Sequence, residues 1–369
     1  MPPTRYLFVS TPVGPLGSGI GGGVELNLLN LARQLVRHGD EVRILAPAGS
    51  KTGDIPCTTV AGLPPKFAQA SEREAPVQFS LPSVLANLWN EARQLAPQFD
   101  LIVNWAYDWL PLYLTPFLQQ PVAHIISMAS LNDGLDIAIA RVRQAFPGTV
   151  AVHSRAQAAT FPDVPRCPLT ILPCGIDLNQ YTFVPQASQP PCWLGRLAPE
   201  KGLEDCAALS EHLQIPITVL GKLQDTHYWD NVRSRFPGAQ LDYRGFLPTH
   251  KMQQIIGQSR ALLVTPKWVE AFGMVAVEAL ACGVPAIVYN RGGPAEIVES
   301  GISGWVVEPD NIAALAEAVL KIDEIDRRAC RDRVETHFSL STMHATFKQW
   351  SHIILTHNSD GRGPLLKNN

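Results

Sequence analysis

Short runs of apolar, largely β-branched residues alternate with longer amphipathic stretches along most of the chain. The runs are too uniformly apolar for strands with one solvated face, which indicates strands covered on both faces. Alternation of such strands with helices predicts a mostly parallel sheet with helices packed on it. In the first half, the expected strands are residues 5–10, 41–46, 100–104, 122–127 and 149–154.

Residues 23–39 show the helical pattern most clearly. The apolar face consists of Leu28, Leu31, Leu35 and Val36, which recur at helical spacing, and Gly39 is a natural C-terminal stop. We therefore expect an amphipathic helix directly after the first strand.

Residues 162–191 interrupt the pattern with seven prolines, and a second series of strands and helices follows. Two such α/β units place a ligand-binding cleft at the carboxyl ends of two parallel sheets. The expected strands of the second series are residues 192–197, 216–222, 240–245, 261–266, 285–290 and 305–308.

This organisation predicts domain boundaries. We expect an N-terminal Rossmann-like domain over residues 1–165, a Pro-rich linker over 166–191 and a C-terminal Rossmann-like domain over 192–337. Residues 338–358 are amphipathic and predict a last helix that packs back on the N-terminal domain, whereas 359–369 lack periodicity and are expected to be mobile.

Composition narrows the function classes. The 30 Lys and Arg against 33 Asp and Glu give a net charge of -3, which argues against a nucleic-acid partner. No apolar run reaches the roughly 18 residues that span a bilayer, and the N-terminal run is too short for a secretory signal. Seven cysteines without a C-x-x-C pair indicate reduced thiols. We expect a cytoplasmic protein without stable membrane association.

A glycine-rich loop follows the first strand. Residues 17–22 match G-x-G-x-x-G, but the glycines begin several residues after the strand, and residues 46–48 offer no carboxylate for a ribose. These departures disfavour a dinucleotide-binding oxidoreductase. Gly21, Gly22 and Gly23 nevertheless open a helix whose backbone N–H groups suit a phosphate or a sugar oxygen, the alternative being a flexible turn.

Two cations lie close together in the second half. Arg196 follows an expected strand and Lys201 precedes a helix, so both can lie beside the amino end of that helix. A diphosphate leaving group needs such cations because bond cleavage loads negative charge onto its oxygens. The alternative is a surface pair that bridges Glu200 and Glu204 and contributes little.

Two carboxylates flank the start of a later helix. Glu270 precedes the helix and can accept hydrogen bonds from sugar hydroxyls, and Glu278 lies within it and can hold a ribose. Backbone N–H groups at the start of a helix can meet a ligand, and we expect this of those around Ala271, Phe272 and Gly273.

The sequence EAFGMVAVE resembles the E-x(7)-E signature of retaining GT-B glycosyltransferases, specifically glycosyltransferase family 4. The resemblance implies an α/β protein with two Rossmann-like domains that face each other across a cleft, and a UDP-sugar-dependent hexosyltransferase. It covers nearly the whole chain, at the glycine loop 21–23, the G-R-x-x-x-x-K segment 195–201, and residues 172–178, 292–298 and 303–309.

The resemblance also implies roles for individual residues. Those matching Arg196 and Lys201 bind the donor pyrophosphate and the one matching Glu270 contacts the donor sugar, so these three are the expected catalytic residues. The residue matching Glu278 holds the ribose. Further donor contacts are implied at Gly22 and Gly23 to phosphate, near Phe246 to the base, and at Ala271, Phe272 and Gly273.

One position departs from the family pattern. Many members carry a histidine near the reacting centre after the fourth strand, where this chain has Ser127. His124 lies three residues earlier and points to the other face of the strand, so we expect it to be structural. The accessory group of the reaction is therefore left open, with Ser127 as a candidate on the acceptor side.

The chain contains no D-x-D motif, the acidic pair with which metal-dependent glycosyltransferases commonly hold Mg²⁺ or Mn²⁺. We therefore expect no metal and no cofactor, with Arg196, Lys201 and helix N-termini neutralising the leaving group. The family resemblance implies front-face attack, in which the departing phosphate takes the proton of the acceptor hydroxyl.

Aromatic residues concentrate after the third strand. Trp105, Tyr107, Trp109 and Tyr113 could stack on a flat acceptor ring, the alternative being core packing. Within the family, the sequence resembles cyanobacterial glucosyltransferases that use UDP-glucose and tetrahydrobiopterin, which implies these two substrates and an α-glucoside product. A small aromatic acceptor would suit the aromatic cluster.

Two alternatives stay open. The same family acts on lipid or polysaccharide acceptors, but the helix over 23–39 has only Arg33, Arg37 and His38 opposed by Glu25, which disfavours membrane docking. A GT-B fold could also hold a sugar nucleotide without turnover.

Overall fold

The computed structural model describes residues 3–18, 22–65, 72–78 and 80–359. The chain divides into two compact units, which we call the first unit (Met1–Gly175 with Leu340–Asn369) and the second unit (Ile176–Ser339). The division therefore falls within the expected linker, whose residues 166–175 belong to the first unit and 176–191 to the second. Gly21 and residues 360–369 lie outside the described residues.

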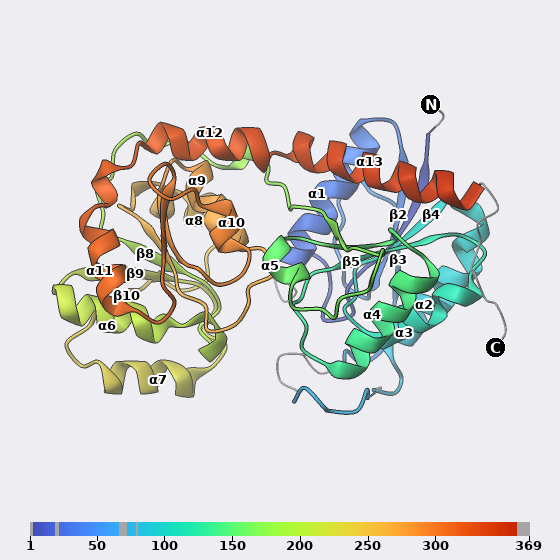
Figure 1. The fold of residues 1–369 in the computed structure, drawn as a ribbon, viewed down its shortest axis with the longest axis horizontal. Coiled ribbons are helices and arrows are strands. Elements are labelled where there is room, and N and C mark those ends of the chain that lie inside the picture. Colours follow the sequence, from blue (N-terminus) through green and yellow to red (C-terminus); the bar gives the residue numbers. More distant parts are fainter. Residues whose placement is uncertain (1–2, 19–21, 66–71, 79, 360–369) are drawn as a thin grey trace. The chain divides into compact units, whose positions relative to one another are not determined.

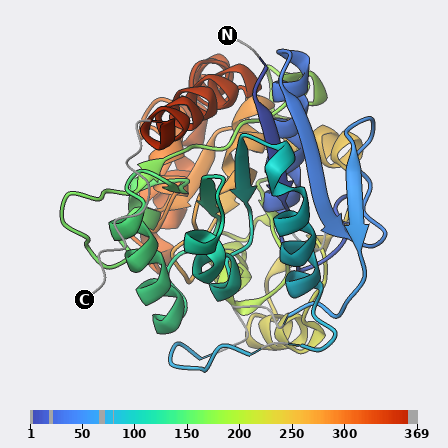
Figure 2. The ribbon, with the colours of Figure 1, turned by 90° about the vertical axis from the view of Figure 1, so that its right-hand side faces the viewer.

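The first unit is built on a seven-stranded sheet in the order β3-β2-β1-β4-β5-β6-β7, with every neighbouring pair parallel (Figure 2). The five expected strands are present. The edge strands β3 and β7 were not predicted, because they are short and only half-buried and so lack a long apolar run. The strands are β1 (Arg5–Val9), β2 (Glu41–Pro47), β3 (Cys57–Val60), β4 (Leu101–Asn104), β5 (Val122–Ile126), β6 (Val150–Val152) and β7 (Thr170–Ile171).

Helices cover both faces of this sheet. Alternate residues of β1 point to opposite faces, so Tyr6 and Phe8 pack in one core cluster and Leu7 and Val9 in another. This double burial explains the continuous apolar runs of the sequence. The helices are α1 (Gly23–Arg37), α2 (Val84–Leu95), α3 (Trp109–Leu114), α4 (Asp133–Ala145), α5 (Arg155–Ala158) and α13 (Leu340–Ser359), with 3₁₀ turns η2 (Ala96–Gln98) and η3 (Thr115–Phe117).

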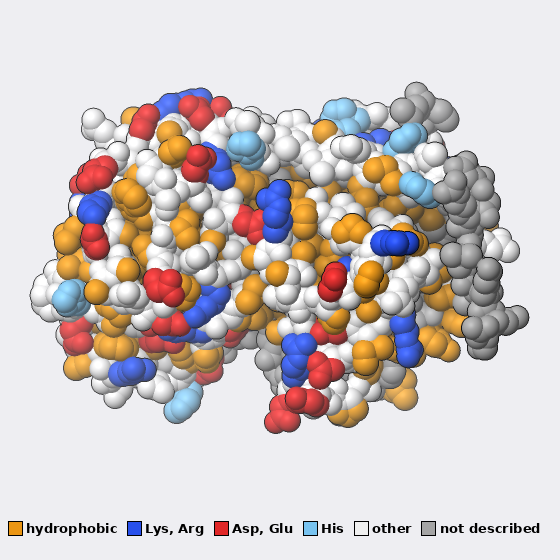
Figure 3. Space-filling view, viewed as in Figure 1, with side chains coloured by type: hydrophobic (Ala, Val, Ile, Leu, Met, Phe, Trp, Pro, Cys, Tyr) orange, Lys and Arg blue, Asp and Glu red, His pale blue; other side chains and the backbone are white. Residues whose placement is uncertain are grey.

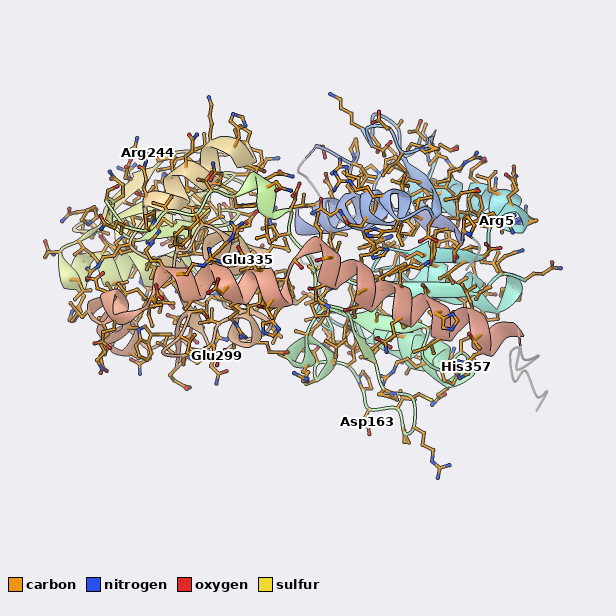
Figure 4. The ribbon with its side chains drawn as sticks, turned by 90° about the horizontal axis from the view of Figure 1, so that it is seen from above. Arg5, Asp163, Arg244, Glu299, Glu335 and His357 are labelled. Atoms are coloured by element: carbon orange, nitrogen blue, oxygen red, sulfur yellow. The ribbon has the colours of Figure 1, made fainter. Side chains whose placement is uncertain are left out.

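The last helix, α13, lies beside α1, although more than three hundred residues separate the two in sequence (Figures 1 and 4). Its Phe347 is fully buried, with its ring centroid 5.6 Å from that of Tyr6. Lys348 Nζ lies 2.9 Å from both carboxyl oxygens of Asp40, and Trp350 Nε1 donates to the carbonyl of Gly148 at 2.6 Å. The C-terminal helix thus completes the core of the first unit.

The second unit contains a six-stranded parallel sheet in the order β10-β9-β8-β11-β12-β13. The six strands expected from the sequence form it, and the fold-class prediction of two parallel-sheet Rossmann-like units is confirmed. The strands are β8 (Cys192–Leu194), β9 (Pro216–Leu220), β10 (Gln240–Tyr243), β11 (Leu262–Val264), β12 (Ala286–Tyr289) and β13 (Gly304–Val307).

Helices connect these strands in the manner of a Rossmann-like unit. Helix α6 (Leu203–Leu213) follows β8, and helix α9 (Met274–Ala281) follows β11. The remaining elements are α7 (Thr226–Arg235), α8 (Thr249–Gln258), α10 (Pro294–Ile297), α11 (Ile312–Leu320) and α12 (Arg327–His337), with 3₁₀ turns η4 (Leu178–Gln180), η5 (Pro199–Lys201) and η6 (Ile322–Glu324).

The surface carries charges of both signs. On the face shown in Figure 3, Lys and Arg side chains are interspersed with Asp and Glu, as the net charge of -3 leads one to expect. Across the described ranges, no helix is both long enough and apolar enough to cross a bilayer.

We predict that α13 is required for the stability of the first unit. Phe347→Ala should lower the free energy of unfolding by about 3–5 kcal/mol, because it leaves a cavity beside Tyr6 and Phe8. Ile353→Ala, on the exposed side of the same helix, should change it by less than about 0.5 kcal/mol. Urea unfolding of both full-length variants measures the difference, and equal midpoints would contradict the assignment.

Candidate functional site

Strand order locates the point in each sheet where ligands bind in open α/β folds. In the second unit, the chain continues from β8 to β9 and β10 on one side of β8, and then forms β11, β12 and β13 on its other side. The strand order therefore reverses between β8 and β11. A crevice forms at the carboxyl ends of the strands at such a switch point. The loop after β8 carries Arg196 and Lys201, and the loop after β11 carries Glu270. Three predicted site residues are therefore brought to the same sheet edge.

Lys201 and Glu270 form an ion pair across these two loops. Lys201 Nζ lies 2.5 Å from Glu270 Oε2, and Trp268 Nε1 donates to the same oxygen at 3.0 Å. The ammonium also lies 5.0 Å from the centre of the Trp268 ring. Burial alone would raise the pKa of Glu270, but the charge and hydrogen bond of Lys201 outweigh it, and the pKa is lowered. The carboxylate is thus held anionic and oriented.

Trp268 is a residue of this site that the sequence did not single out. It stands two positions before Glu270, inside the segment that carries the E-x(7)-E pattern. Its place two residues before a predicted site carboxylate was the signal in the sequence, because an indole N–H can donate to a carboxylate. A tryptophan is, however, more often a packing residue.

Arg196 lies near the same edge with different partners. One guanidinium nitrogen donates to Gln224 Oε1 at 2.7 Å and another lies 2.8 Å from Glu200 Oε1. The sequence left open that Arg196 and Lys201 only form surface pairs with Glu200 and Glu204. Arg196 does contact Glu200, whereas Lys201 pairs with Glu270. Arg196 is about one-third exposed, so its charge can reach an anion.

Glycines allow the backbones of the loops after β8, β11 and β12 to approach one another closely. A Cβ on Gly202 would lie 1.9 Å from the carbonyl oxygen of Thr265, and one on Gly292 would lie 2.4 Å from that of Glu270. Both glycines have positive φ, at 67° and 80°. Thr265 Oγ1 donates back to the carbonyl of Gly202 at 2.8 Å. The backbone that carries Lys201 and Glu270 is consequently fixed by direct contact.

A second network of charged residues fixes the loop after β11. Lys267 Nζ lies 2.6 Å from Asp205 Oδ2 and 2.8 Å from Asp310 Oδ1. Asp205 also accepts from the Tyr289 hydroxyl at 2.6 Å, and Arg291 donates to the carbonyl of Pro266 at 2.8 Å. These bonds join α6, the loop after β11 and the end of β12, and so position Glu270.

Glu278 lies within α9 and is buried. Burial raises the pKa of its carboxyl to about 7, and a hydrogen bond from Tyr181 opposes this rise. Because Ala271, Phe272 and Gly273 directly precede α9, their backbone lies at its amino end as predicted from the sequence. The side chain of Phe246, in the loop after β10, is 63% exposed.

The predicted glycine contacts belong to the first unit. Gly22 is the N-cap of α1 and Gly23 its first residue, at the amino end of a 15-residue helix. Glu25, in the first turn, accepts a hydrogen bond from the backbone N–H of Gly17 at 2.8 Å, which ties the loop after β1 to the helix. In this sheet the strand order reverses between β1 and β4, so these glycines follow a switch-point strand.

The aromatic residues after β4 divide into two kinds. Trp105 is 2% exposed, and its ring packs 5.8 Å from that of Phe8 in the core. The structure thus corrects the expectation that Trp105 stacks on an acceptor, since it leaves no ring face for one. Tyr107 and Trp109 are half-buried, and Trp109 stacks on Tyr113 at 4.5 Å.

Ser127, at the end of β5, is paired with a histidine that the sequence did not single out. Its hydroxyl lies 2.9 Å from Nε2 of His153, which follows β6. Nδ1 of His153 lies 2.9 Å from the carbonyl oxygen of Leu172 and must be protonated to bond it. Burial lowers the pKa of His153 and so favours the neutral ring, whose Nε2 then accepts a hydrogen bond from the Ser127 hydroxyl. In this arrangement the Ser127 oxygen can itself act as a hydrogen-bond acceptor.

His124 is fully buried, and both of its ring nitrogens are bonded. Nδ1 lies 3.2 Å from Asn104 Nδ2 and Nε2 lies 2.9 Å from Thr115 Oγ1. Burial lowers its pKa to about 3, so it stays neutral. These contacts give it a structural part within the first unit.

The predicted site residues thus gather at two sheet edges, one in each unit. The second unit offers two cations and two carboxylates, and the first offers a helix N-terminus, half-buried aromatics and Ser127. The former set suits a diphosphate and a sugar. Over the part of the chain that the structure describes, no group of three or more His, Cys, Asp or Glu side chains could hold a metal ion.

Two family models match successive parts of the chain. Residues 21–180 match the model for Glycosyltransferase Family 4, and residues 192–336 match that for Glycosyl transferases group 1. The first match falls mainly in the first unit and the second in the second unit.

Curated relatives agree with these matches. The D-inositol 3-phosphate glycosyltransferase of Mycolicibacterium smegmatis is 25% identical over 95% of this chain and 89% of its own. The sucrose synthase of Acidithiobacillus caldus is 28% identical over 36% of this chain. The matched segments span 18% of that enzyme and 7% and 8% of two plant sucrose synthases, so the chain corresponds to less than a fifth of these relatives' length.

Solved structures show the same fold. HepE of Anabaena, in complex with UDP and glucose, superposes over 95% of this chain and 99% of its own with a TM-score of 0.73 and 19% identity. Two glycosyltransferase models match successive parts of the chain, and both units fold as parallel-sheet Rossmann-like domains, so the chain has the GT-B fold of the glycosyltransferases of group 1 and family 4.

Proposed function

We propose that the protein transfers glucose from UDP-glucose to a small acceptor, with tetrahydrobiopterin as the first candidate, and gives an α-glucoside. The observation that carries the donor part is the convergence of Arg196, Lys201 and Glu270 at the switch point between β8 and β11, with Glu278 in the following helix. The structure of HepE with UDP and glucose, on the same fold, supports the choice of donor.

In this proposal the second unit holds the donor. Arg196 and Lys201 neutralise the diphosphate, Glu270 accepts hydrogen bonds from the hexose, and Glu278 accepts them from the ribose hydroxyls. The main chain near Phe246 is proposed to meet the base, and the main chain at 271–273, at the amino end of α9, to meet the donor. Gly22 and Gly23, at the amino end of α1, offer backbone N–H groups that suit a phosphate.

The transfer itself needs no enzyme nucleophile. The acceptor hydroxyl attacks the anomeric carbon on the face from which UDP departs, while the bond from that carbon to the β-phosphate oxygen breaks and its electron pair stays on the phosphate. The departing phosphate takes the acceptor's proton, so configuration is retained. The residues contribute position and charge stabilisation. Because Arg196 and Lys201 can neutralise the phosphate, we propose that the reaction requires no metal.

The acceptor is proposed to bind to the first unit. Tyr107 and Trp109 are half-buried aromatic residues next to the switch-point strand β4, which suits a flat bicyclic ring. Ser127, as a hydrogen-bond acceptor, suits a substrate hydroxyl or N–H group. We further propose that the protein acts in the cytoplasm.

One observation favours a second candidate acceptor, a lipid or a polysaccharide. Trp109, Tyr113 and Phe117 form a row of aromatic rings in successive contact along α3 and η3. Tyr113 is 49% exposed and Phe117 is 68% exposed, so the exposed row of rings is longer than a small bicyclic acceptor would need. An extended acceptor could use it.

The test incubates the protein with UDP-glucose and tetrahydrobiopterin without oxygen and looks for products by mass spectrometry. The proposal predicts a hexosylated pterin and free UDP, with an α-anomeric proton coupling in the NMR spectrum. UDP without that product would contradict the pterin acceptor, and product with a β-coupling would contradict retention.

We predict that Lys201→Ala lowers kcat/KM for UDP-glucose by about 10²–10³-fold, the usual effect of removing one donor that stabilises developing negative charge. Lys321→Ala is the matched control, because Lys321 also lies 2.5 Å from a glutamate but on the surface. It should leave kcat/KM unchanged. Normal turnover by both Lys201→Ala and Arg196→Ala would contradict the leaving-group assignment.

We predict that UDP binding strengthens as the pH rises through about 7. Because the pKa of Glu278 is raised, its carboxyl is protonated below that pH. The protonated carboxyl accepts hydrogen bonds from ribose hydroxyls poorly. The dissociation constant should rise up to roughly tenfold per pH unit below the pKa. Calorimetric titration from pH 6 to 8.5 measures this for the native protein and Glu278→Gln.

The Glu278→Gln protein should lack the part of the pH dependence that belongs to Glu278. Titration of the nucleotide's own phosphate is common to both proteins and cancels in the comparison. Identical pH profiles would rule out Glu278 as the group responsible.

A further inference from the structure

Tyr181 touches Glu278 from a separate segment of the second unit. It follows η4 and is 4% exposed, and its hydroxyl donates to Glu278 Oε1 at 2.9 Å. A phenylalanine would fill the same space but could not donate this hydrogen bond, so the contact with the carboxylate depends on the hydroxyl. The bond joins residues that are 97 positions apart in sequence.

An arginine fixes Tyr181 relative to the helix that carries Glu278. Arg331 of α12 donates to the carbonyl of Tyr181 at 2.8 Å and to that of Ala281, the last residue of α9, at 2.6 Å. Its Nε lies 2.8 Å from Glu335, which Figure 4 labels on the same helix. Backbone and side chain of Tyr181 are therefore both tied to α9.

The bond decides what Glu278 can offer a ligand. A carboxylate has about four lone-pair directions on two oxygens, and the phenol uses one of them on Oε1. Rotation about the last side-chain bond is thereby restricted, and Oε2 keeps a defined direction for ligand hydroxyls. Burial, the charge of Glu278 and the hydrogen bond to it all raise the pKa of Tyr181, so the phenol keeps its proton and acts as a donor.

We propose that Tyr181 is a positioning residue for the donor, whose phenol orients Glu278 to accept hydrogen bonds from the ribose hydroxyls. This inference rests on the proposed function, in which Glu278 holds the ribose. It adds a residue outside the E-x(7)-E segment to the recognition of the nucleotide. It predicts that Tyr181 matters for the binding of nucleotides with ribose hydroxyls and much less for nucleotides that lack both of them.

The experiment compares binding of UDP and 2′,3′-dideoxy-UDP, which lacks both ribose hydroxyls, by calorimetry at pH 7.5. Tyr181→Phe should weaken UDP binding about tenfold, as expected for one hydrogen bond to a charged group, and leave the affinity for 2′,3′-dideoxy-UDP within about twofold. Tyr228→Phe is the matched control, because that phenol also donates to a glutamate, Glu204. It should leave both dissociation constants unchanged.

A double variant separates positioning from packing. In the Glu278→Gln background, adding Tyr181→Phe should cause no further loss of UDP affinity, because the carboxylate that it orients is gone. If the hydroxyl of Tyr181 served only the stability of the fold, any loss of affinity would be equal in both backgrounds and for both nucleotides, and the inference would be overturned. Thermal unfolding of each variant checks that it is folded.

The outcomes also distinguish this inference from the proposed function. If Glu278→Gln weakens UDP binding and Tyr181→Phe does not, the inference fails and the role of Glu278 stands. If Glu278→Gln binds UDP as the native protein does, the ribose role itself fails and the inference fails with it.

Discussion

Close backbone contact between loops at the carboxyl edge of the second sheet is the constraint on which the candidate donor site depends. Gly202 meets the carbonyl of Thr265, and Gly292 meets that of Glu270, at distances that exclude a Cβ. Such contact holds the loops after β8 and β11 in one arrangement. Arg196, Lys201 and Glu270 thus stand on rigid backbone, as a site that stabilises developing charge requires.

The charges of the site follow from this arrangement. Lys201 keeps Glu270 anionic despite burial, whereas Glu278 accepts a hydrogen bond from the neutral phenol of Tyr181, and burial raises its pKa to about 7. The two glutamates of one signature therefore differ in their electrostatic environment. Lys267 instead pairs with Asp205 and Asp310 and so ties the loop after β11 to α6 and to the segment after β13. The lysines at 201 and 267 therefore differ in their partners.

Much of this was accessible from the sequence. Apolar runs gave the buried strands, and their alternation with helices gave the parallel sheets, because both depend on local pattern. The pairing of two such units was implied by the resemblance of several motifs to a known family. The edge strands β3 and β7 were not predicted, and the sequence could not decide between ring stacking and core packing for Trp105, since both depend on packing partners far along the chain. The Ser127–His153 and Tyr181–Glu278 bonds join residues 26 and 97 positions apart, and no local pattern announces them.

A crystal structure of the protein with UDP tests the central claim most directly, that the switch-point edge of the second sheet holds the donor. The account predicts the diphosphate within hydrogen-bond distance of the Arg196 and Lys201 side chains, and the ribose hydroxyls on Glu278. UDP bound elsewhere, or bound there with its ribose turned away from Glu278 and its phosphates away from both cations, would contradict it.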